Sequence, residues 1–189
     1  MGVDILSICL DKGFVLWFTG LPGSGKTTIA SRVAEVLKSK GYRVELIDGD
    51  WARKTVSVGS GFTREERMIH LKRIAWIARL LARNGVIVLC SFVSPYREAR
   101  KMIREIIEEE VPFTEIYVYC PLEECIRRDP KGLYRKALKG EIKHFTGITD
   151  PYEEPENPDL KLDTHKESIE ECVNKVLNYI RERYNIDSL

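Results

Sequence analysis

The sequence predicts an α/β fold in which helices cover both faces of a parallel sheet of five strands. The first observation is that short apolar runs, at 14–19, 42–47, 86–90, 113–119 and 160–163, alternate with segments of helical periodicity. This alternation is typical of parallel sheets. The second is a glycine-rich turn between the first apolar run and the first helical segment. The third is that no repeat or shift in composition divides the chain, so we expect one domain over residues 1–189, with an N-terminal extension at 1–12.

The composition predicts a globular protein with neither a membrane nor a nucleic acid as its partner. The net charge is +1, which argues against a general nucleic-acid binder. No apolar run approaches the roughly 20 residues of a membrane span, and the N-terminus lacks the features of a signal peptide. The cysteines form no C-x-x-C pair, so we expect free, buried thiols in a reducing, cytoplasmic compartment. They are Cys9, Cys90, Cys120, Cys125 and Cys172.

The glycine-rich turn has the pattern of a phosphate-binding loop. Residues 20–27 read GLPGSGKT and match G-x-x-x-x-G-K-[ST] at every position. Glycines let successive backbone N–H groups face phosphate oxygens, and the following helix places its positive end there. We expect Lys26 to reach the β- and γ-phosphates and Thr27 to bind Mg²⁺. The predicted nucleoside triphosphate site is Gly20, Leu21, Pro22, Gly23, Ser24, Gly25, Lys26, Thr27 and Thr28.

Two acidic residues follow the second predicted strand. Asp48 and Asp50 are separated by one glycine, and carboxylates just past the C-terminal end of such a strand point into the ligand crevice. The third strand ends without an acidic residue, at the place where a metal-binding carboxylate is usually sought. Asp48 or Asp50 is therefore expected to serve the metal. Residues 51–61, which include a Gly/Ser-rich stretch, are expected to form a mobile connection.

Three helix starts are indicated by their capping residues. Thr63 and Glu66 form a capping box, and the helix they open is expected to end at an Asn-Gly pair at 84–85. Ser94, followed by proline, is expected to be the N-cap of the next helix, which runs to about residue 110. Thr164 and Glu167 form a second capping box, from which we expect the final helix to start.

A basic segment follows the fourth predicted strand. Residues 121–140 are helical in pattern but interrupted by Asp129-Pro130 and Gly132, and residues 140–159 form a proline-rich loop. We define residues 121–148 as the lid segment, which is expected to close over phosphates, neutralise charge and exclude water. An ordinary exposed basic helix is the alternative. Its cations are Arg127, Arg128, Lys131, Arg135, Lys136 and Lys139.

Six motifs occur in order along the chain. They are GLPGSGKTT at 20–28, IDGDWAR at 47–53, GFTREER at 61–67, FVSPYR at 92–97, PLEECIRRDPKGLYRKA at 121–137 and FTGITDPYEEPENPDLKLDT at 145–164. Over about residues 14–180 the chain thus resembles the adenylylsulfate kinase (APS kinase) family. The resemblance implies a P-loop NTPase fold with three α/β/α layers and a basic helical lid. It also implies an enzyme of sulfate assimilation that transfers the γ-phosphoryl of ATP to the 3′-hydroxyl of adenylylsulfate, giving 3′-phosphoadenylylsulfate and ADP.

On the donor side, the resemblance implies that ATP lies on residues 20–28, with Arg128 and Thr164 near its adenine. Asp48 and Asp50 match the family's acidic pair, which holds Mg²⁺ through water and orients or deprotonates the 3′-hydroxyl; which of the two acts as base stays open. Ser94 matches a serine proposed in this family to carry phosphate. In-line transfer needs no covalent step, and we expect Ser94 to act as a helix cap. The implied metal ligands are Thr27 and Asp48, and the implied catalytic residues are Lys26, Asp48, Asp50 and Ser94.

On the acceptor side, the resemblance implies two arginines and two aromatic rings. Arg53 and Arg67 match arginines that hold the anionic phosphosulfate, for which a guanidinium fork is suited. Phe62 and Phe145 match aromatic residues that sandwich the substrate adenine. Lys131, in the lid segment, is implied to approach the phosphates on closure. The full set implied for substrate binding is Asp50, Arg53, Phe62, Arg67, His70, Val93, Ser94, Lys131 and Phe145.

The chain departs from the family pattern on the acceptor side. His70 stands where the family usually has Asn, and its charge is expected to vary near pH 6–7. Residues 57–60 replace a more polar stretch, and His144 replaces another polar residue. Two alternatives therefore stay open: a P-loop kinase for a different small nucleotide acceptor, and a non-catalytic sulfonucleotide-binding module. The resemblance also implies a homodimer, and association with a sulfurylase stays open.

Overall fold

The sheet predicted from the sequence is present in the computed structural model, which describes residues 10–186. Every strand pair in it is parallel, and the strand order is β2-β3-β1-β4-β5. The strands β4 and β5 coincide with the predicted ranges. The strands are β1 (Val15–Thr19), β2 (Val44–Asp48), β3 (Ile87–Ser91), β4 (Phe113–Tyr119) and β5 (Leu160–Asp163).

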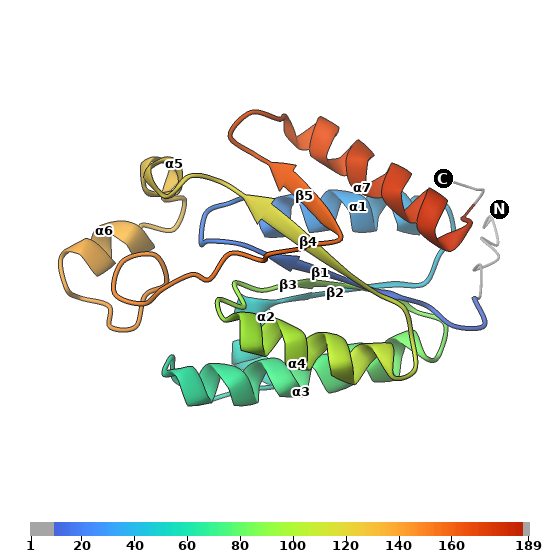
Figure 1. The fold of residues 1–189 in the computed structure, drawn as a ribbon, viewed down its shortest axis with the longest axis horizontal. Helices are drawn as coiled ribbons and strands as arrows, with labels where there is room; N and C mark the ends of the chain where they lie inside the picture. Colours follow the sequence, from blue (N-terminus) through green and yellow to red (C-terminus); the bar gives the residue numbers. More distant parts are fainter. Residues whose placement is uncertain (1–9, 187–189) are drawn as a thin grey trace, which may run out of the picture.

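Helices cover both faces of this sheet, as predicted (Figure 1). Along β1, Leu16 and Phe18 pack into the core on the α1 and α7 side, whereas Val15 and Trp17 pack into the core on the α3 and α4 side. A strand that is buried on both faces has a continuous apolar sequence, and residues 14–19 show this pattern. The helices are α1 (Lys26–Ser39), α2 (Gly49–Thr55), α3 (Arg64–Ala82), α4 (Arg97–Glu108), α5 (Leu122–Arg128), α6 (Leu133–Leu138) and α7 (Ile169–Tyr184).

The strand order creates a crevice at the C-terminal ends of the central strands. β1 lies between β3 and β4, so the chain leaves the sheet in opposite directions at this point. Ligands of open α/β sheets bind at such a switch point. Asp48 at the end of β2 is opposite Ser91 at the end of β3, so the two residues reach the same edge. The helices α5 and α6 project beyond that edge (Figure 1).

The mobile connection expected at residues 51–61 is partly wrong, because residues 49–55 form helix α2. Asp48 is its N-cap, and the Asp48 Oδ1 accepts a hydrogen bond of 2.8 Å from the backbone N–H of Trp51. Asp50 in the first turn and Arg53 in the last turn match the helix dipole. The helix is too short for helical periodicity to reveal it, and the cap role of Asp48 is additional to the metal and catalytic roles predicted for it.

The prediction that Ser94 is the N-cap of a helix is also wrong. The helix α4 starts at Arg97 with Tyr96 as its N-cap, and Ser94 has a φ of 38°. The first turn is capped from a distant segment instead, since the backbone N–H of Arg97 donates to the Glu153 carboxylate at 2.8 Å. Sequence spacing cannot show a cap that comes from another part of the chain.

Of the two predicted capping boxes, only the first is present. At α3, the Thr63 hydroxyl accepts from the backbone N–H of Glu66, and the Glu66 carboxylate accepts from the backbone N–H of Thr63. The final helix instead has its capping box at Ser168 and Glu171, so it starts later than predicted. Thr164 is occupied in a contact with the lid segment, described below.

The predicted burial of the cysteines holds for those that the structure describes. Cys90, Cys120, Cys125 and Cys172 are free and buried, whereas Cys9 lies outside the described residues. Between residues 10 and 186, no helix combines the length and the hydrophobicity needed to cross a bilayer.

Candidate active site

The phosphate-binding loop joins β1 to α1 at the crevice. Gly25 precedes α1 with a φ of 97°, and a Cβ at Gly20 would lie 2.4 Å from the Val118 carbonyl oxygen, so the loop requires glycine at both positions. The Lys26 Nζ donates hydrogen bonds to the carbonyl oxygens of Gly20 (2.9 Å) and Leu21 (2.7 Å). Burial lowers the pKa of Lys26 to about 8. The ammonium group thus lies within the loop that it is predicted to serve.

Two hydroxyl groups meet at the start of α1, beside the strand end that carries Asp48. The Thr27 Oγ1 lies 3.0 Å from the Ser91 Oγ, and Asp48 is opposite Ser91 in the parallel register of β2 and β3. Mg²⁺ prefers such oxygen ligands, takes few of them from the protein and keeps several waters. The chemistry of these donors fits Mg²⁺. The third strand, β3, ends without an acidic residue, but its last residue, Ser91, supplies a hydroxyl oxygen beside Thr27.

The lid segment contacts the phosphate-binding loop from two sides. The Tyr134 hydroxyl donates to the Pro22 carbonyl oxygen at 2.9 Å. Arg128 donates to the carbonyl oxygen of Thr164 at 2.6 Å, and the Thr164 hydroxyl donates to the Ser24 carbonyl oxygen at 2.9 Å. Arg128 and Thr164, both predicted near the ATP adenine, are therefore in contact with each other and adjoin the loop. These contacts join residues that are far apart along the chain, so the sequence could not predict them.

A second contact connects the lid segment to α2. Lys131 forms an ion pair with Asp50, and both side chains are mostly exposed. The cation predicted to approach phosphates and the acid predicted to orient the acceptor hydroxyl are thus direct partners. This pairing connects the lid segment to the helix that follows the acidic end of β2.

The acceptor-side residues Arg53 and Phe62 are adjacent. The Arg53 guanidinium lies 4.0 Å from the centre of the Phe62 ring and donates to the carbonyl oxygens of Ser60 (3.0 Å) and Gly61 (2.9 Å). Burial and the nearby Arg67 lower the pKa of Arg53. Phe62 is 46% exposed, and the Arg67 guanidinium lies 5.3 Å from the centre of its ring.

Arg67 connects both predicted aromatic positions. Its Nε donates to the Phe62 carbonyl oxygen at 2.8 Å, and another of its nitrogens donates to the His144 carbonyl oxygen at 2.5 Å, directly before Phe145. The Asp150 carboxylate lies 4.0 Å from the same guanidinium. Phe145 is buried and packs edge-on against a lid tyrosine with ring centres 5.0 Å apart. Arg67 thus contacts both segments that carry the predicted aromatic residues.

His70 is buried and bonded to another residue at which the chain departs from the family pattern. Its Nδ1 lies 2.8 Å from the Ser57 Oγ, and the two side chains are 3% and 1% exposed. Burial, reinforced by the charges of Arg53, Arg73 and Arg67, lowers the pKa of His70 to about 4. The expected change of charge near pH 6–7 is therefore wrong, and the ring is neutral there. The two departures form one hydrogen-bonded pair, which loop spacing could not reveal.

A group of buried hydroxyls lies beneath the loop and was missed in the sequence. The Thr19 Oγ1 donates to the Val93 carbonyl oxygen at 2.8 Å and accepts from the Ser94 Oγ at 2.9 Å. The Trp17 Nε1 donates to the same Ser94 oxygen at 3.2 Å. Ser94 is 2% exposed, so its hydroxyl serves this group rather than a helix end. A threonine that closes an apolar strand just before the glycine-rich loop was the available signal.

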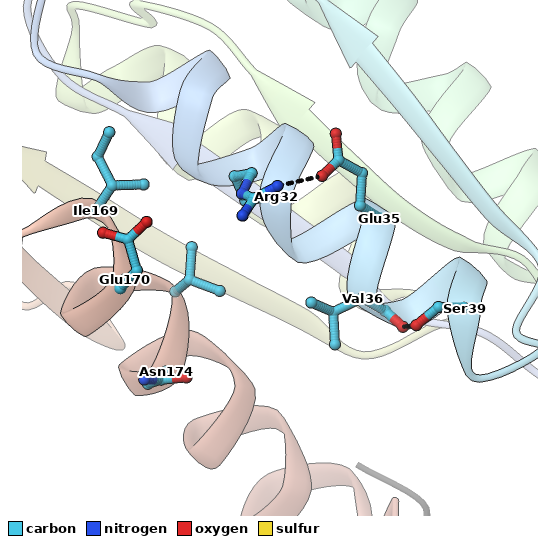
Figure 2. A pocket seen from close by; sticks show the side chains of 8 residues that line it. Arg32, Glu35, Val36, Ser39, Ile169, Glu170 and Asn174 are labelled. Atoms are coloured by element: carbon cyan, nitrogen blue, oxygen red, sulfur yellow. Dashed lines mark hydrogen bonds and ion pairs between the residues drawn. The ribbon is translucent and has the colours of Figure 1, made fainter.

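A concavity of about 350 Å³ lies elsewhere, between α1 and α7 (Figure 2). Arg32, Glu35, Ile169 and Glu170 are among the side chains that line it, and none of the predicted site residues does. We therefore place the candidate site at the crevice, where the predicted residues gather.

Comparison with known proteins agrees with the motifs. The sequence profile of the family described as "Adenylylsulphate kinase" matches residues 12–163. The chain is 69% identical over 174 residues to the "Probable adenylyl-sulfate kinase" of Aeropyrum pernix, covering 92% of this chain and 95% of that protein. It is 54% identical over 173 residues to the "Adenylyl-sulfate kinase" of Halothermothrix orenii, covering 92% of each.

A solved structure extends this similarity to the fold. The structure of the Mycobacterium tuberculosis APS kinase CysC in complex with AMPPNP and APS is similar with a TM-score of 0.88 and 42% identity. The match covers 90% of this chain and 98% of that chain. The three-layer P-loop fold and kinase function predicted from the motifs agree with these relatives, and the chain belongs to the adenylylsulfate kinase family.

Proposed function

We propose that the protein transfers the γ-phosphoryl group of ATP to the 3′-hydroxyl of adenylylsulfate, giving 3′-phosphoadenylylsulfate and ADP. The observation that carries this proposal is the Asp50–Lys131 ion pair, which joins a phosphate-binding loop and lid to a second set of anion-binding and aromatic residues. The identity of 69% and 54% to relatives named adenylyl-sulfate kinase supports the same acceptor. A site with two such halves is suited to two nucleotides.

On the donor side, the backbone N–H groups of residues 20–28 bind the ATP phosphates, and Lys26 pairs with the β- and γ-phosphates. The short distance between Lys26 and the loop carbonyls supports this role, since a small shift of the ammonium group brings it to a phosphate in the loop. The pair of Arg128 and Thr164 borders the adenine. These groups position ATP and stabilise charge, which is most of what phosphoryl transfer asks of a protein.

Mg²⁺ is the metal that the donor set fits. Thr27 is its proposed direct ligand, and Asp48 is proposed to hold it through water; the contact between the Thr27 and Ser91 hydroxyls places a further oxygen at this corner. When bound, Mg²⁺ would neutralise phosphate charge during the transfer. The protein's own part is to hold Thr27 at the first turn of α1 and Asp48 at the end of β2.

On the acceptor side, Arg53 and Arg67 bind the phosphosulfate and the rings of Phe62 and Phe145 flank the adenine. The partial exposure of Phe62 supports stacking, which contributes about 1–3 kcal/mol per base. Asp50 orients or deprotonates the 3′-hydroxyl. Because Asp50 is paired with Lys131, we propose that bound phosphates draw Lys131 away and leave the carboxylate to the hydroxyl.

We propose direct transfer without a phosphorylated Ser94. The Ser94 hydroxyl is buried, donates to Thr19 and accepts from Trp17, so it is not offered to the crevice. An in-line displacement by the 3′-hydroxyl needs no covalent intermediate.

The test is ADP production with Mg·ATP and a panel of acceptors. Turnover on adenylylsulfate, with little on adenylylsulfate analogues that lack the 3′-hydroxyl, is the expected result. Turnover on another nucleotide but not on adenylylsulfate would favour the first alternative, a kinase with a changed acceptor. Tight adenylylsulfate binding by calorimetry without turnover on any acceptor would favour the second, a binding module.

We further propose a cytoplasmic location, supported by free thiols at Cys90, Cys120, Cys125 and Cys172. The homodimer stays a prediction, which sedimentation equilibrium of the purified chain tests.

A further inference from the structure

Arg100 of α4 is a buried cation that the proposed reaction does not use. It is 4% exposed and forms an ion pair of 2.8 Å with Glu115 of β4. Its side-chain hydrogen bonds go to loops: it donates to the Ser94 carbonyl oxygen at 2.8 Å and to the Glu153 carbonyl oxygen at 2.6 Å. The guanidinium thus spans β4, the turn after β3 and the chain beyond the lid segment.

The chain beyond the lid segment runs along the start of α4. We define residues 150–154 as the strap. The backbone N–H of Glu153 donates to the Pro95 carbonyl oxygen at 2.8 Å, and the Glu153 carboxylate accepts from the backbone N–H of Arg97 at 2.8 Å. At its other end the strap begins with Asp150, which lies 4.0 Å from Arg67. The position of the strap therefore bears on the acceptor side of the site.

The strap is also joined to the end of β1, where the phosphate-binding loop begins. The Tyr152 hydroxyl lies 3.0 Å from the Thr19 Oγ1, which in turn accepts from Ser94. Ser94 has a φ of 38°, a conformation that residues other than glycine rarely adopt and that surrounding contacts must hold in place. Arg100 binds the carbonyl of this residue and the carbonyl that follows Tyr152.

We propose that Arg100 is a positioning residue, which holds the Ser94 turn and the strap in register so that the acceptor side lies correctly against the phosphate-binding loop. This inference rests on the proposed function for its kinetic test, but the contacts themselves can be tested separately. The planar guanidinium supplies several donors in fixed directions, so it donates to two carbonyls while it forms an ion pair with a carboxylate. A lysine keeps the charge beside Glu115 but cannot reproduce this fork.

A neighbouring arginine shows what a purely structural role would be. Arg104, one turn further along α4, binds Asp159 at 2.6 Å and lies 3.8 Å from Glu115. Its other partners include Glu108 and the Phe113 ring, and none of its contacts within the described part of the chain involves Ser94 or the strap. If Arg100 served only to neutralise Glu115, replacing Arg100 would change the kinetic constants no more than replacing Arg104 does.

The kinetic test compares Arg100→Lys with the matched control Arg104→Lys in the full chain. In Arg100→Lys we expect the KM for adenylylsulfate to rise about tenfold or more, because small misplacements of a binding group are costly, while the KM for ATP stays within about twofold. In Arg104→Lys we expect both constants to stay near those of the unaltered chain. A Glu115→Gln variant, which keeps both carbonyl contacts of Arg100, should lower the melting temperature with little change in the ratio of the two KM values.

Amide hydrogen exchange tests the contacts without turnover. In Arg100→Lys the Glu153 and Arg97 amides should lose protection, whereas in Arg104→Lys they should keep it. Wild-type ratios of KM in a folded Arg100→Lys protein would overturn the proposal, as would equal loss of protection in the two variants. If the unaltered chain fails to phosphorylate adenylylsulfate, the proposed function is wrong, and the exchange data alone then decide whether Arg100 positions the strap.

Discussion

Asp50 is the residue whose replacement separates chemistry from stability most clearly. Its carboxylate is exposed and paired only with exposed Lys131 among the described contacts, and such surface pairs contribute about 0–1 kcal/mol. In Asp50→Ala we expect kcat to fall roughly 10²–10⁴-fold, the usual loss on removing a positioned acid–base group, with an unchanged melting temperature. Glu45→Ala, an exposed acid of β2, is the control. A near-wild-type kcat in Asp50→Ala would remove this residue from the mechanism.

The lowered pKa of Lys26 predicts that ATP binds less well at alkaline pH. Its pKa in the folded protein is lowered to about 8, so the ammonium loses its proton as the pH rises through that value. We expect kcat/KM for ATP, which reports the free enzyme, to fall above about pH 8, and kcat to fall only at higher pH because bound phosphates favour the charged form. Steady-state profiles between about pH 7 and pH 10 measure both quantities.

The lowered pKa of Lys26 also predicts how the free energy of unfolding changes with pH. Between about pH 8 and the ordinary lysine pKa of 10.5, the unfolded chain binds more protons than the native one, so the contribution of Lys26 to stability increases with pH. Coincident alkaline limbs for kcat and kcat/KM would contradict the role of phosphate contact in this prediction.

The pair of His70 and Ser57 predicts acid sensitivity of the fold. With its pKa lowered to about 4, native His70 stays neutral between about pH 4 and pH 6.5, where the unfolded histidine gains a proton. Its contribution to stability is therefore present above about pH 6.5 and is lost as the pH falls toward 4. We expect His70→Asn to show a weaker loss of stability across this range in urea titrations. Ser57→Ala, which keeps the titrating group, should retain the dependence.

At the scale of elements, the capping box of α3 was predictable because its two partners are separated by only three residues. The short helix α2 and the distant cap of α4 were not, because one lacks a full period and the other depends on Glu153 from beyond the lid segment. The same distinction holds for the site. The glycine-rich loop is local and was recognised residue by residue, whereas the contacts of His70, Ser94 and Arg100 are made only in the folded chain.

The α3 capping box also supports a prediction. Thr63→Ala removes the hydroxyl that accepts from Glu66 and should destabilise the protein by about 1 kcal/mol. Because Arg67 lies one turn later, fraying of this end should also raise the KM for adenylylsulfate. Urea unfolding, with a lower midpoint at constant slope, measures the first effect. Thr55→Ala, an exposed threonine at the end of α2, is the control; an equal loss in both variants would argue against a specific contribution of the cap.

At the scale of the whole molecule, the sheet and its two helical layers followed from the alternation of apolar and helical segments. The strand order placed the predicted residues at one edge, which spacing alone could only suggest. What the sequence could not provide is the way in which the halves meet. The lid segment contacts the phosphate-binding loop through Tyr134 and α2 through Lys131, and these contacts join residues that are 112 and 81 positions apart.

The lid contact leads to a prediction about the whole catalytic cycle. Lys131 is exposed, so Lys131→Ala should leave the free energy of unfolding within about 0.5 kcal/mol of the unaltered chain. If bound phosphates draw Lys131 from Asp50, the variant should nevertheless lose kcat, since the phosphates lose a cation during transfer. Lys139→Ala, an exposed lysine of the same lid segment, should change neither quantity. Loss of stability without loss of kcat in Lys131→Ala would show that the ion pair is only a structural contact, and the proposed exchange of partners would then be wrong.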